Sequence, residues 1–185
     1  MSNRTALYES HIAAGARMVD FAGWEMPLHY GSQIEEHHSV RNEAGMFYVS
    51  HMTVIDVAGE QAGQFLCRLV ANNVGKLVET GKALYGLLLN DAGGVVDDLI
   101  VYRREKGYRC VVNAGTREKV LVWFAEHNDE GVELEERDLA MVAVQGPRAL
   151  SIYEQVSGLT GLAELAPFSA RDMQETMVAR TGYTG

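Results

Sequence analysis

The chain has 185 residues, of which 47% are hydrophobic, and its formal net charge at pH 7 is -9. This length and composition suffice for one large or two small folded domains. The acidic balance excludes a broad nucleic-acid surface, because phosphate binding needs clustered Lys and Arg. The N-terminus shows no secretion signal and no apolar run is long enough to span a membrane, so a cytoplasmic protein without a membrane partner is expected.

The first quarter of the chain predicts a loop, a helix and a strand. Residues 21–30 are rich in aromatic side chains and are expected to form a loop. Ser32, followed three residues later by Glu35, is typical of a helix N-terminus, and this helix should end at Gly45. Residues 46–57 are rich in β-favouring side chains and predict one strand.

The middle of the chain predicts an antiparallel sheet with two helices. Apolar side chains recur at helical spacing over residues 60–72, and a helix is expected to begin at the N-cap residue Thr116. The predicted strands after the first helix are 82–89, 95–102, 108–112 and 132–134. With the preceding strand the order becomes β-α-β-β-β-α-β. It predicts an α+β fold, with a split-βαβ (ferredoxin-like) antiparallel sheet and helices on one face.

The last quarter predicts a strand over 139–144, a helix that begins near Pro147, and a strand from Met177. The chain then stops at TGYTG, where a strand and turn invite a return partner, so a truncated protein is expected. Residues 1–50 with 138–185 are predicted to form an incomplete outer domain. Residues 51–137 are predicted to form a domain inserted into it.

Two adjacent carboxylates, Asp97 and Asp98, are the first candidates for chemistry. They follow a glycine-bearing turn and begin an otherwise apolar strand. Successive strand side chains point to opposite faces, so one carboxylate can face a pocket while the other meets solvent or a cap. Apolar neighbours suit an acid that holds a cation or a proton. A solvated strand end is the alternative, and parity alone does not choose between the two residues.

Six ordered segments resemble the aminomethyltransferase (T-protein) family of the glycine cleavage system. They are FAGWEMPLHYGSQIEEHHSVR, GMFYVSHM, GKALYGLLLNDAGGVVDDLIVY, VVNAGTREK, AVQGP and RTGYTG. The resemblance runs from Leu7 to the last residue and covers the N-terminal portion of the family. It implies the folate-binding aminomethyltransferase-like fold, here truncated and without the family's C-terminal barrel domain.

The resemblance also implies an activity. Members of the family transfer the methylene of an aminomethyl group, carried on the dihydrolipoyl arm of H-protein, to tetrahydrofolate, and ammonia is released. The implied co-substrate is tetrahydrofolate without a metal, and the implied partners are H-protein and the other glycine cleavage components. Such chemistry needs a pocket for a flat pterin and a negative group near a developing positive charge.

The family motifs imply functional roles for individual residues of this chain. Asp97 matches the functional acid, which is the first aspartate of GGxxDD, whereas Asp98 is expected to be structural. Met52 resembles a soft folate contact, and Asn113 and Tyr183 resemble pterin contacts. The alternative roles of these three are core packing, a turn before the helix and a strand-end aromatic. The weaker candidates for the cavity wall are Tyr85 and Tyr102, which otherwise simply pack.

The four residues 35–38, EEHH, offer helix-spaced metal ligands, but a solvated helix face is the favoured interpretation because the family uses no metal. Cys67 and Cys110 have no metal-type spacing and are expected to be reduced thiols. Tyr48 stands where the family commonly has an aspartate, so the local support around Met52 is expected to differ from the family's without loss of function.

The family's acidic pterin anchor and its arginines for the folate tail lie beyond residue 185. The fragment is therefore expected to be inactive and to bind folate weakly if at all. Two other functions within the same superfamily stay open. One is a demethylating folate domain, disfavoured because no dinucleotide-binding glycine motif precedes Leu7. The other is a non-catalytic paralogue that assists iron-sulfur cluster assembly, disfavoured because RTGYTG lacks that group's cysteine.

Overall fold

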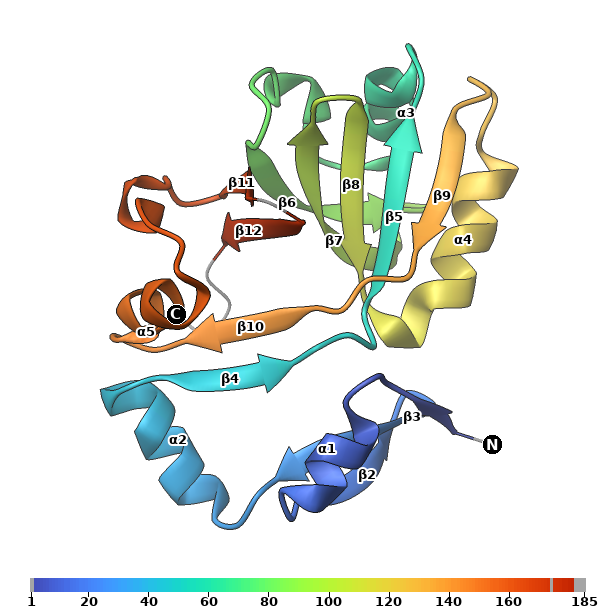
Figure 1. The fold of residues 1–185 in the computed structure, drawn as a ribbon. Helices are drawn as coiled ribbons and strands as arrows, with labels where there is room; N and C mark the ends of the chain where they lie inside the picture. Colours follow the sequence, from blue (N-terminus) through green and yellow to red (C-terminus); the bar gives the residue numbers. More distant parts are fainter. Residues whose placement is uncertain (1, 174, 182–185) are drawn as a thin grey trace. The chain divides into compact units, whose positions relative to one another are not determined.

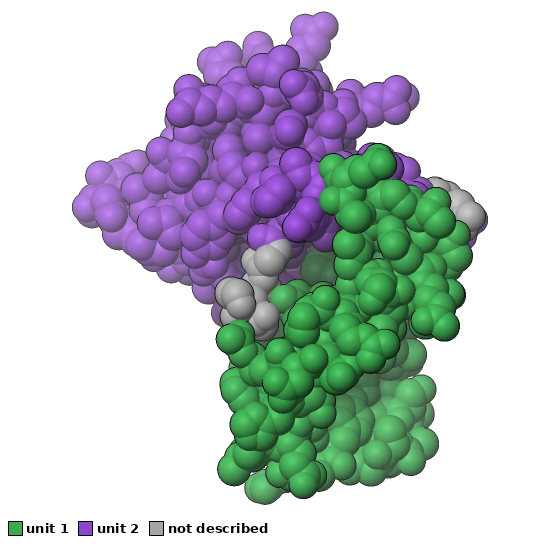
Figure 2. Space-filling model, turned by 90° about the vertical axis from the view of Figure 1, so that its left-hand side faces the viewer, with its two compact units in different colours: residues 1–51, 140–164, 183–185 green, residues 52–139, 165–182 purple. Residues whose placement is uncertain are grey.

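The computed structural model describes residues 2–173 and 175–181. Contacts divide the chain into two compact units, coloured separately in Figure 2. Unit 1 comprises Met1–His51, Ala140–Glu164 and Tyr183–Gly185, and unit 2 comprises Met52–Leu139 and Leu165–Gly182. The predicted domain boundaries stay a prediction, and the contacts group residues 165–182 with unit 2 rather than with the flanking segments.

Unit 2 is built on a five-stranded sheet with the order β6-β7-β8-β5-β9, in which every neighbouring pair is antiparallel. Figure 1 shows this sheet with its two helices. The elements of unit 2 are β5 (Thr53–Ala58), α3 (Ala62–Leu69), η1 (Val74–Lys76), β6 (Ala83–Leu89), β7 (Val95–Arg104), β8 (Gly107–Val112), η2 (Ala114–Thr116), α4 (Arg117–Glu126), β9 (Glu133–Arg137), β11 (Ser169–Met173) and β12 (Thr176–Arg180). The predicted β-α-β-β-β-α-β order and the α+β fold class are confirmed.

The helices α3 and α4 cover one face of this sheet. Phe65 of α3 and Phe124 of α4 meet edge to face, with ring centroids 5.4 Å apart, and both belong to one buried apolar cluster. From β7 the cluster takes Leu99 and Val101, which alternate along the strand as one face requires. Fully burying one such side chain stabilises the fold by about 1.5–3 kcal/mol. The apolar spacing that predicted the helices is thus the pattern that covers the sheet.

Unit 1 contains smaller sheets. The strand β3 pairs with β2 in antiparallel and with β1 in parallel fashion, and β4 pairs with β10. The elements of unit 1 are β1 (Asn3–Arg4), α1 (Tyr8–Ala13), β2 (Arg17–Phe21), β3 (Trp24–His29), α2 (Gln33–Asn42), β4 (Gly45–Tyr48), β10 (Val142–Gln145), α5 (Ala149–Ser157) and η3 (Leu162–Glu164). Ser32 caps α2 as predicted, since its hydroxyl accepts a hydrogen bond from the Glu35 N–H. No helix in the described part of the chain is long and apolar enough to cross a bilayer.

Two predictions about unit 1 and its boundary are wrong. Residues 21–30 do not form a loop: Ala22 and Gly23, both with positive φ, make a two-residue turn, and β3 follows it. The strand predicted over residues 46–57 is two strands, because β4 pairs with β10 whereas β5 pairs with β8 and β9. β-Favouring composition indicates that residues are extended, but it does not indicate which partner they choose.

Candidate functional site

One end of the unit 2 sheet brings together three of the six predicted site residues. Val112, the last residue of β8, pairs with Leu99 of β7 on one side and with Thr53 of β5 on the other. The residues that flank these three therefore gather at the same end of the sheet. They are Asp97 and Asp98 before Leu99, Met52 before Thr53, and Asn113 after Val112.

Asp97 and Asp98 follow an irregularity in β7 and, as consecutive strand residues, point to opposite faces of the sheet. The register shifts so that Leu88 pairs with Asp97 but Leu89 pairs with Val95, which leaves Val96 as an extra residue. Beyond the bulge, Asp97 alternates with Leu99 and lies on the helix-covered face. Asp97 is only 5% exposed, whereas Asp98 lies on the opposite face and is half-buried.

The Asp97 carboxylate is held by three donors from residues 113–116. The backbone N–H of Asn113 donates to Oδ2 at 3.1 Å, its side-chain Nδ2 donates to Oδ1 at 2.8 Å, and the Thr116 hydroxyl donates to Oδ2 at 2.7 Å. Every partner is a donor, which suits an ionised carboxylate because that form only accepts hydrogen bonds. The loop before α4 thus forms a polar cradle around a buried carboxylate.

Thr116 has a different role from the predicted one. It occupies the N-cap position of α4, but its side chain makes no cap hydrogen bond to the helix. Its hydroxyl instead lies 2.7 Å from Asp97 Oδ2 and 3.1 Å from the Asn113 carbonyl oxygen. Sequence reasoning therefore missed Thr116 as a site residue. The signal available was its spacing of three residues from Asn113, but a threonine before a helix normally indicates a cap.

The Asn113 side chain connects both carboxylates. Its Nδ2 donates to Asp97 Oδ1 at 2.8 Å and to Asp98 Oδ1 at 3.0 Å. The other oxygen of Asp98, Oδ2, accepts a hydrogen bond of 3.1 Å from the Tyr85 hydroxyl. Four residues, Tyr85, Asp98, Asn113 and Asp97, therefore form one connected hydrogen-bond chain that joins β6, β7 and the residue directly after β8. We call these four residues with Thr116 the Asp97 cluster.

Tyr102 lies outside the Asp97 cluster. It stands four residues beyond Asp98 on β7 and is buried, and burial raises the pKa of its hydroxyl above the ordinary value of 10.0. A hydrogen bond with the Thr181 side chain offsets part of that rise. Met52, which directly precedes β5, is half-buried. Tyr183 lies outside the described residues.

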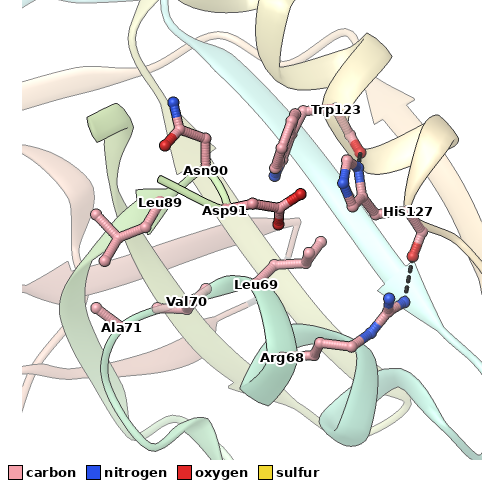
Figure 3. Close-up of a pocket in the computed structure, with 9 residues that line it drawn as sticks. All are labelled: Arg68, Leu69, Val70, Ala71, Leu89, Asn90, Asp91, Trp123 and His127. Carbon is pink, nitrogen blue, oxygen red and sulfur yellow. Dashed lines mark hydrogen bonds between the residues drawn. The ribbon is translucent and has the colours of Figure 1, made fainter. Parts of the chain in front are cut away.

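Unit 2 also has a pocket of about 280 Å³, shown in Figure 3. The ends of α3 and α4 and the β6–β7 turn line it, and the rings of Trp123 and His127, with centroids 3.8 Å apart and planes tilted by 33°, form one wall. The carboxylate of Asp91 points toward these rings (Figure 3). Among the described residues, the lining includes none of the predicted site residues.

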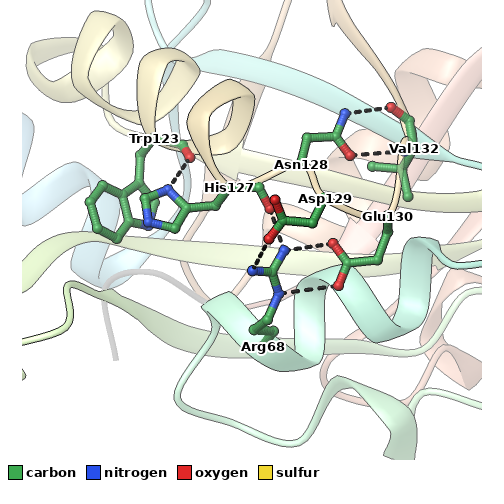
Figure 4. A network of polar contacts seen from close by, with 7 residues as sticks. All are labelled: Arg68, Trp123, His127, Asn128, Asp129, Glu130 and Val132. Atoms are coloured by element: carbon green, nitrogen blue, oxygen red, sulfur yellow. Dashed lines mark hydrogen bonds and ion pairs between the residues drawn. The ribbon is translucent and has the colours of Figure 1, made fainter.

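Arg68 at the edge of this pocket is already neutralised. Its guanidinium binds Asp129 at 2.9 Å and Glu130 at 2.6 Å and also donates to the His127 carbonyl oxygen, as Figure 4 shows. The hydrogen bond with Glu130 is the main reason why the pKa of Arg68 is raised. This pocket therefore offers little net positive charge to an anion, and the polar chemistry concentrates at the Asp97 cluster.

Comparison with known proteins shows which family the chain belongs to. Its residues 7–185 match the family described as the GCVT N-terminal domain. The chain belongs to this family. It is 52% identical to an aminomethyltransferase of Alcanivorax borkumensis, and the alignment covers 100% of this chain and 53% of the relative.

The crystal structure of glycine cleavage system aminomethyltransferase T from Bartonella henselae has the same fold. Its TM-score is 0.92 at 32% sequence identity, and the match covers 100% of this chain and 51% of that one. The chain thus spans about half the length of both relatives. The resemblance and the fold expected from the sequence are confirmed by these matches.

Proposed function

We propose that the protein carrying this chain is an aminomethyltransferase of the glycine cleavage system. It transfers the methylene of an aminomethyl group on dihydrolipoyl H-protein to tetrahydrofolate and releases ammonia. Membership of the GCVT N-terminal domain family supports the proposal. Both relatives, from Alcanivorax borkumensis and Bartonella henselae, bear the name aminomethyltransferase.

The observation that carries the proposal is the cradle around Asp97. A carboxylate offers about four acceptor positions. The donors from Asn113 and Thr116 fill three of them and leave one on Oδ1. A fixed carboxylate stabilises a positive charge or an N–H group that develops beside it without reorganising water, and an electrostatic partner of this kind is worth about 3–4 kcal/mol. Asp97 is therefore the residue we assign to the reacting nitrogen of tetrahydrofolate.

The remaining contacts are proposed from the family motifs and the geometry together. Asn113 and Tyr85 belong to the Asp97 cluster, and Met52 directly precedes β5. We assign these three to the pterin, together with Tyr183, and keep Tyr102 as a weaker contact because it is buried four residues farther along β7. No metal is assigned to the reaction. H-protein and the other glycine cleavage components are the proposed partners, and the cytoplasmic location stays a prediction.

The proposal is tested with Asp97→Asn in the complete gene product. Ammonia release from aminomethylated H-protein in the presence of tetrahydrofolate should fall by about 10²–10³, because the amide keeps the shape of the carboxylate but not its charge. The matched control is Asp138→Asn, which changes an exposed aspartate in the loop after β9. Turnover of Asp97→Asn within twofold of the control would remove Asp97 from the mechanism. Folate binding without any turnover by the unaltered protein would instead favour the non-catalytic paralogue.

A further inference from the structure

In the side-chain amide of Asn113, the nitrogen makes all the hydrogen bonds it can donate, and the carbonyl oxygen accepts none within the described part of the chain. An amide nitrogen carries two hydrogens. Nδ2 lies 2.8 Å from Asp97 Oδ1 and 3.0 Å from Asp98 Oδ1, so each hydrogen has its own carboxylate. The carbonyl end, Oδ1, has no hydrogen-bond partner among residues 2–173 and 175–181, and it is not fully buried.

The two carboxylates determine which way the amide points. Ionised carboxylates only accept hydrogen bonds, so they can face Nδ2 but not the carbonyl oxygen. Rotating the amide by half a turn would place Oδ1 against two negative oxygens and lose both bonds. Charge-assisted bonds of this kind are stronger than neutral ones. Asn113 is therefore left with acceptor capacity alone.

Asp98 is itself fixed at both oxygens. Oδ1 accepts from Asn113, and Oδ2 accepts from the hydroxyl of Tyr85 at 3.1 Å. Tyr85 stands on β6 opposite Ile100 of β7, two residues beyond Asp98 on the same face. Diagonal neighbours on adjacent strands lie within reach of a long aromatic side chain. The strand pairing thus holds the carboxylate where it restrains the amide.

We propose that Asp98, held by Tyr85, is a positioning residue that fixes the Asn113 amide so that Asn113 meets its ligand through Oδ1 only. The ligand group selected at this place is an N–H donor. This inference rests on the proposed function for the identity of the ligand. If the ligand is tetrahydrofolate, the selected group is one of the N–H donors of its pterin, either the exocyclic amine or a ring N–H.

The first test measures donor selectivity by calorimetry on the complete gene product. The probes are tetrahydrofolate and two analogues, one without the exocyclic amine and one methylated at the ring lactam nitrogen. One of the two analogues should bind about tenfold more weakly than tetrahydrofolate, because the Asn113 carbonyl oxygen, once the ligand covers it, would lack its donor. In Asp98→Ala this penalty should shrink to about threefold, because the amide keeps only its bond to Asp97.

Three further variants sharpen this test. Asp98→Asn keeps an oxygen for Asn113 and should preserve the selectivity. Tyr85→Phe should fall between Asp98→Ala and the unaltered protein, because it removes one of the two bonds that hold Asp98. Asp138→Ala, which alters an exposed aspartate, is the matched control and should leave selectivity unchanged. Full selectivity in Asp98→Ala, or equal affinity for all three probes in the unaltered protein, would overturn the proposal.

The second test needs no ligand. The two side-chain amide protons of Asn113 should exchange slowly with water in NMR spectra of the complete gene product, and one of them should exchange at least about tenfold faster in Asp98→Ala. Rapid exchange of both protons in the unaltered protein would overturn the proposal. Failure of tetrahydrofolate to bind any variant would refute the proposed function, whereas the exchange rates would still decide the role of Asp98.

Discussion

The two units of the molecule differ in how they bury their side chains. In the described part of the chain, the large side chains with less than 2% exposure, among them Phe65, Phe124 and Ile55, all lie in unit 2. Among the described residues, unit 1 has more exposed large apolar side chains than unit 2, including Met46 at 70% and Val156 at 82%, although unit 2 exposes some as well, such as Val78 at 79%. Unit 2 therefore has a closed apolar core of its own, whereas the described residues of unit 1 leave much apolar surface uncovered.

Buried polar groups show the same contrast. The Asp97 carboxylate of unit 2 has three donors, as the cost of burying an unpaired charge requires. Among the described residues, four buried side-chain atoms of unit 1 have no hydrogen-bond partner, whereas unit 2 has one, Trp123 Nε1. Those of unit 1 are Thr5 Oγ1, His11 Nε2, Tyr48 Oη and His51 Nδ1. Hydrogen bonds are stronger where a closed core excludes water, so the unit with the larger buried core is also the one that holds the Asp97 carboxylate in a fixed position.

The largest expected effect separates two phenylalanines. Phe65→Ala should lower the free energy of unfolding of unit 2 by about 3–5 kcal/mol, because its ring is fully buried. Phe47→Ala should cost unit 1 only about 1–2 kcal/mol, because this ring is 41% exposed on β4. Urea unfolding followed by tryptophan fluorescence can resolve the units, since Trp24 reports on unit 1 and Trp123 on unit 2. Equal losses for the two variants would contradict the contrast between the units.

A smaller effect is expected from two glycines with positive φ. Gly107 of unit 2 has φ +95°, and an added Cβ would collide with the carbonyl oxygen of Val57 on the neighbouring strand. Gly158 of unit 1 has φ +71° at the C-cap of α5, where an added Cβ meets no heavy atom within 4 Å. Alanine at 158 should therefore cost about 1 kcal/mol, from the left-handed backbone alone.

Gly107→Ala should cost about 3 kcal/mol, because backbone has to move as well. Thermal unfolding of both variants, with Trp123 and Trp24 as the respective probes, checks the pair. If both variants lose the same stability, the strand spacing at Gly107 is looser than the structure indicates.

The sequence predicted unit 2 better than unit 1 for a physical reason. In unit 2 the apolar side chains of α3 and the alternation in β7 face the one core that the unit has, so local periodicity and tertiary packing agree. In unit 1 the turn at Ala22 and Gly23 lacks the usual Asn-Gly or Asp-Gly signal, and the hairpin around it was missed. The break between β4 and β5 was also missed, because partner choice is not a local property.

The residues of the candidate site were largely predictable from the sequence, but the hydrogen bonds that connect them were not. The family motifs identified Asp97 and Asn113, and alternation along the strand predicted opposite faces for Asp97 and Asp98. The hydrogen bond from Thr116 to Asp97 depends on the β7 bulge and on where η2 begins, neither of which the sequence displays. The same holds for the bond from Tyr85 to Asp98, which joins two strands through their register.

The smallest expected effect is a dependence of unit 1 on pH through His51. This side chain is half-buried, its Nδ1 has no partner among the described residues, and Phe21 packs edge-on against its ring at 5.4 Å. Burial lowers the pKa of His51 below its ordinary value of 6.5. The unfolded chain therefore binds a proton here at a higher pH than the folded chain does. The free energy of unfolding must then decrease as the pH falls through 6.5, and level off below the folded-state pKa.

His51→Gln removes the titrating group and should flatten this part of the pH profile of unit 1, as reported by Trp24 fluorescence during urea unfolding. The profile of unit 2, followed through Trp123, should not change, because His51 belongs to unit 1. An unchanged slope for Trp24 would mean that the His51 ring is hydrated in solution. Loss of slope at both tryptophans would mean that the two units unfold together, and the contrast between them would then describe their packing but not their separate stabilities.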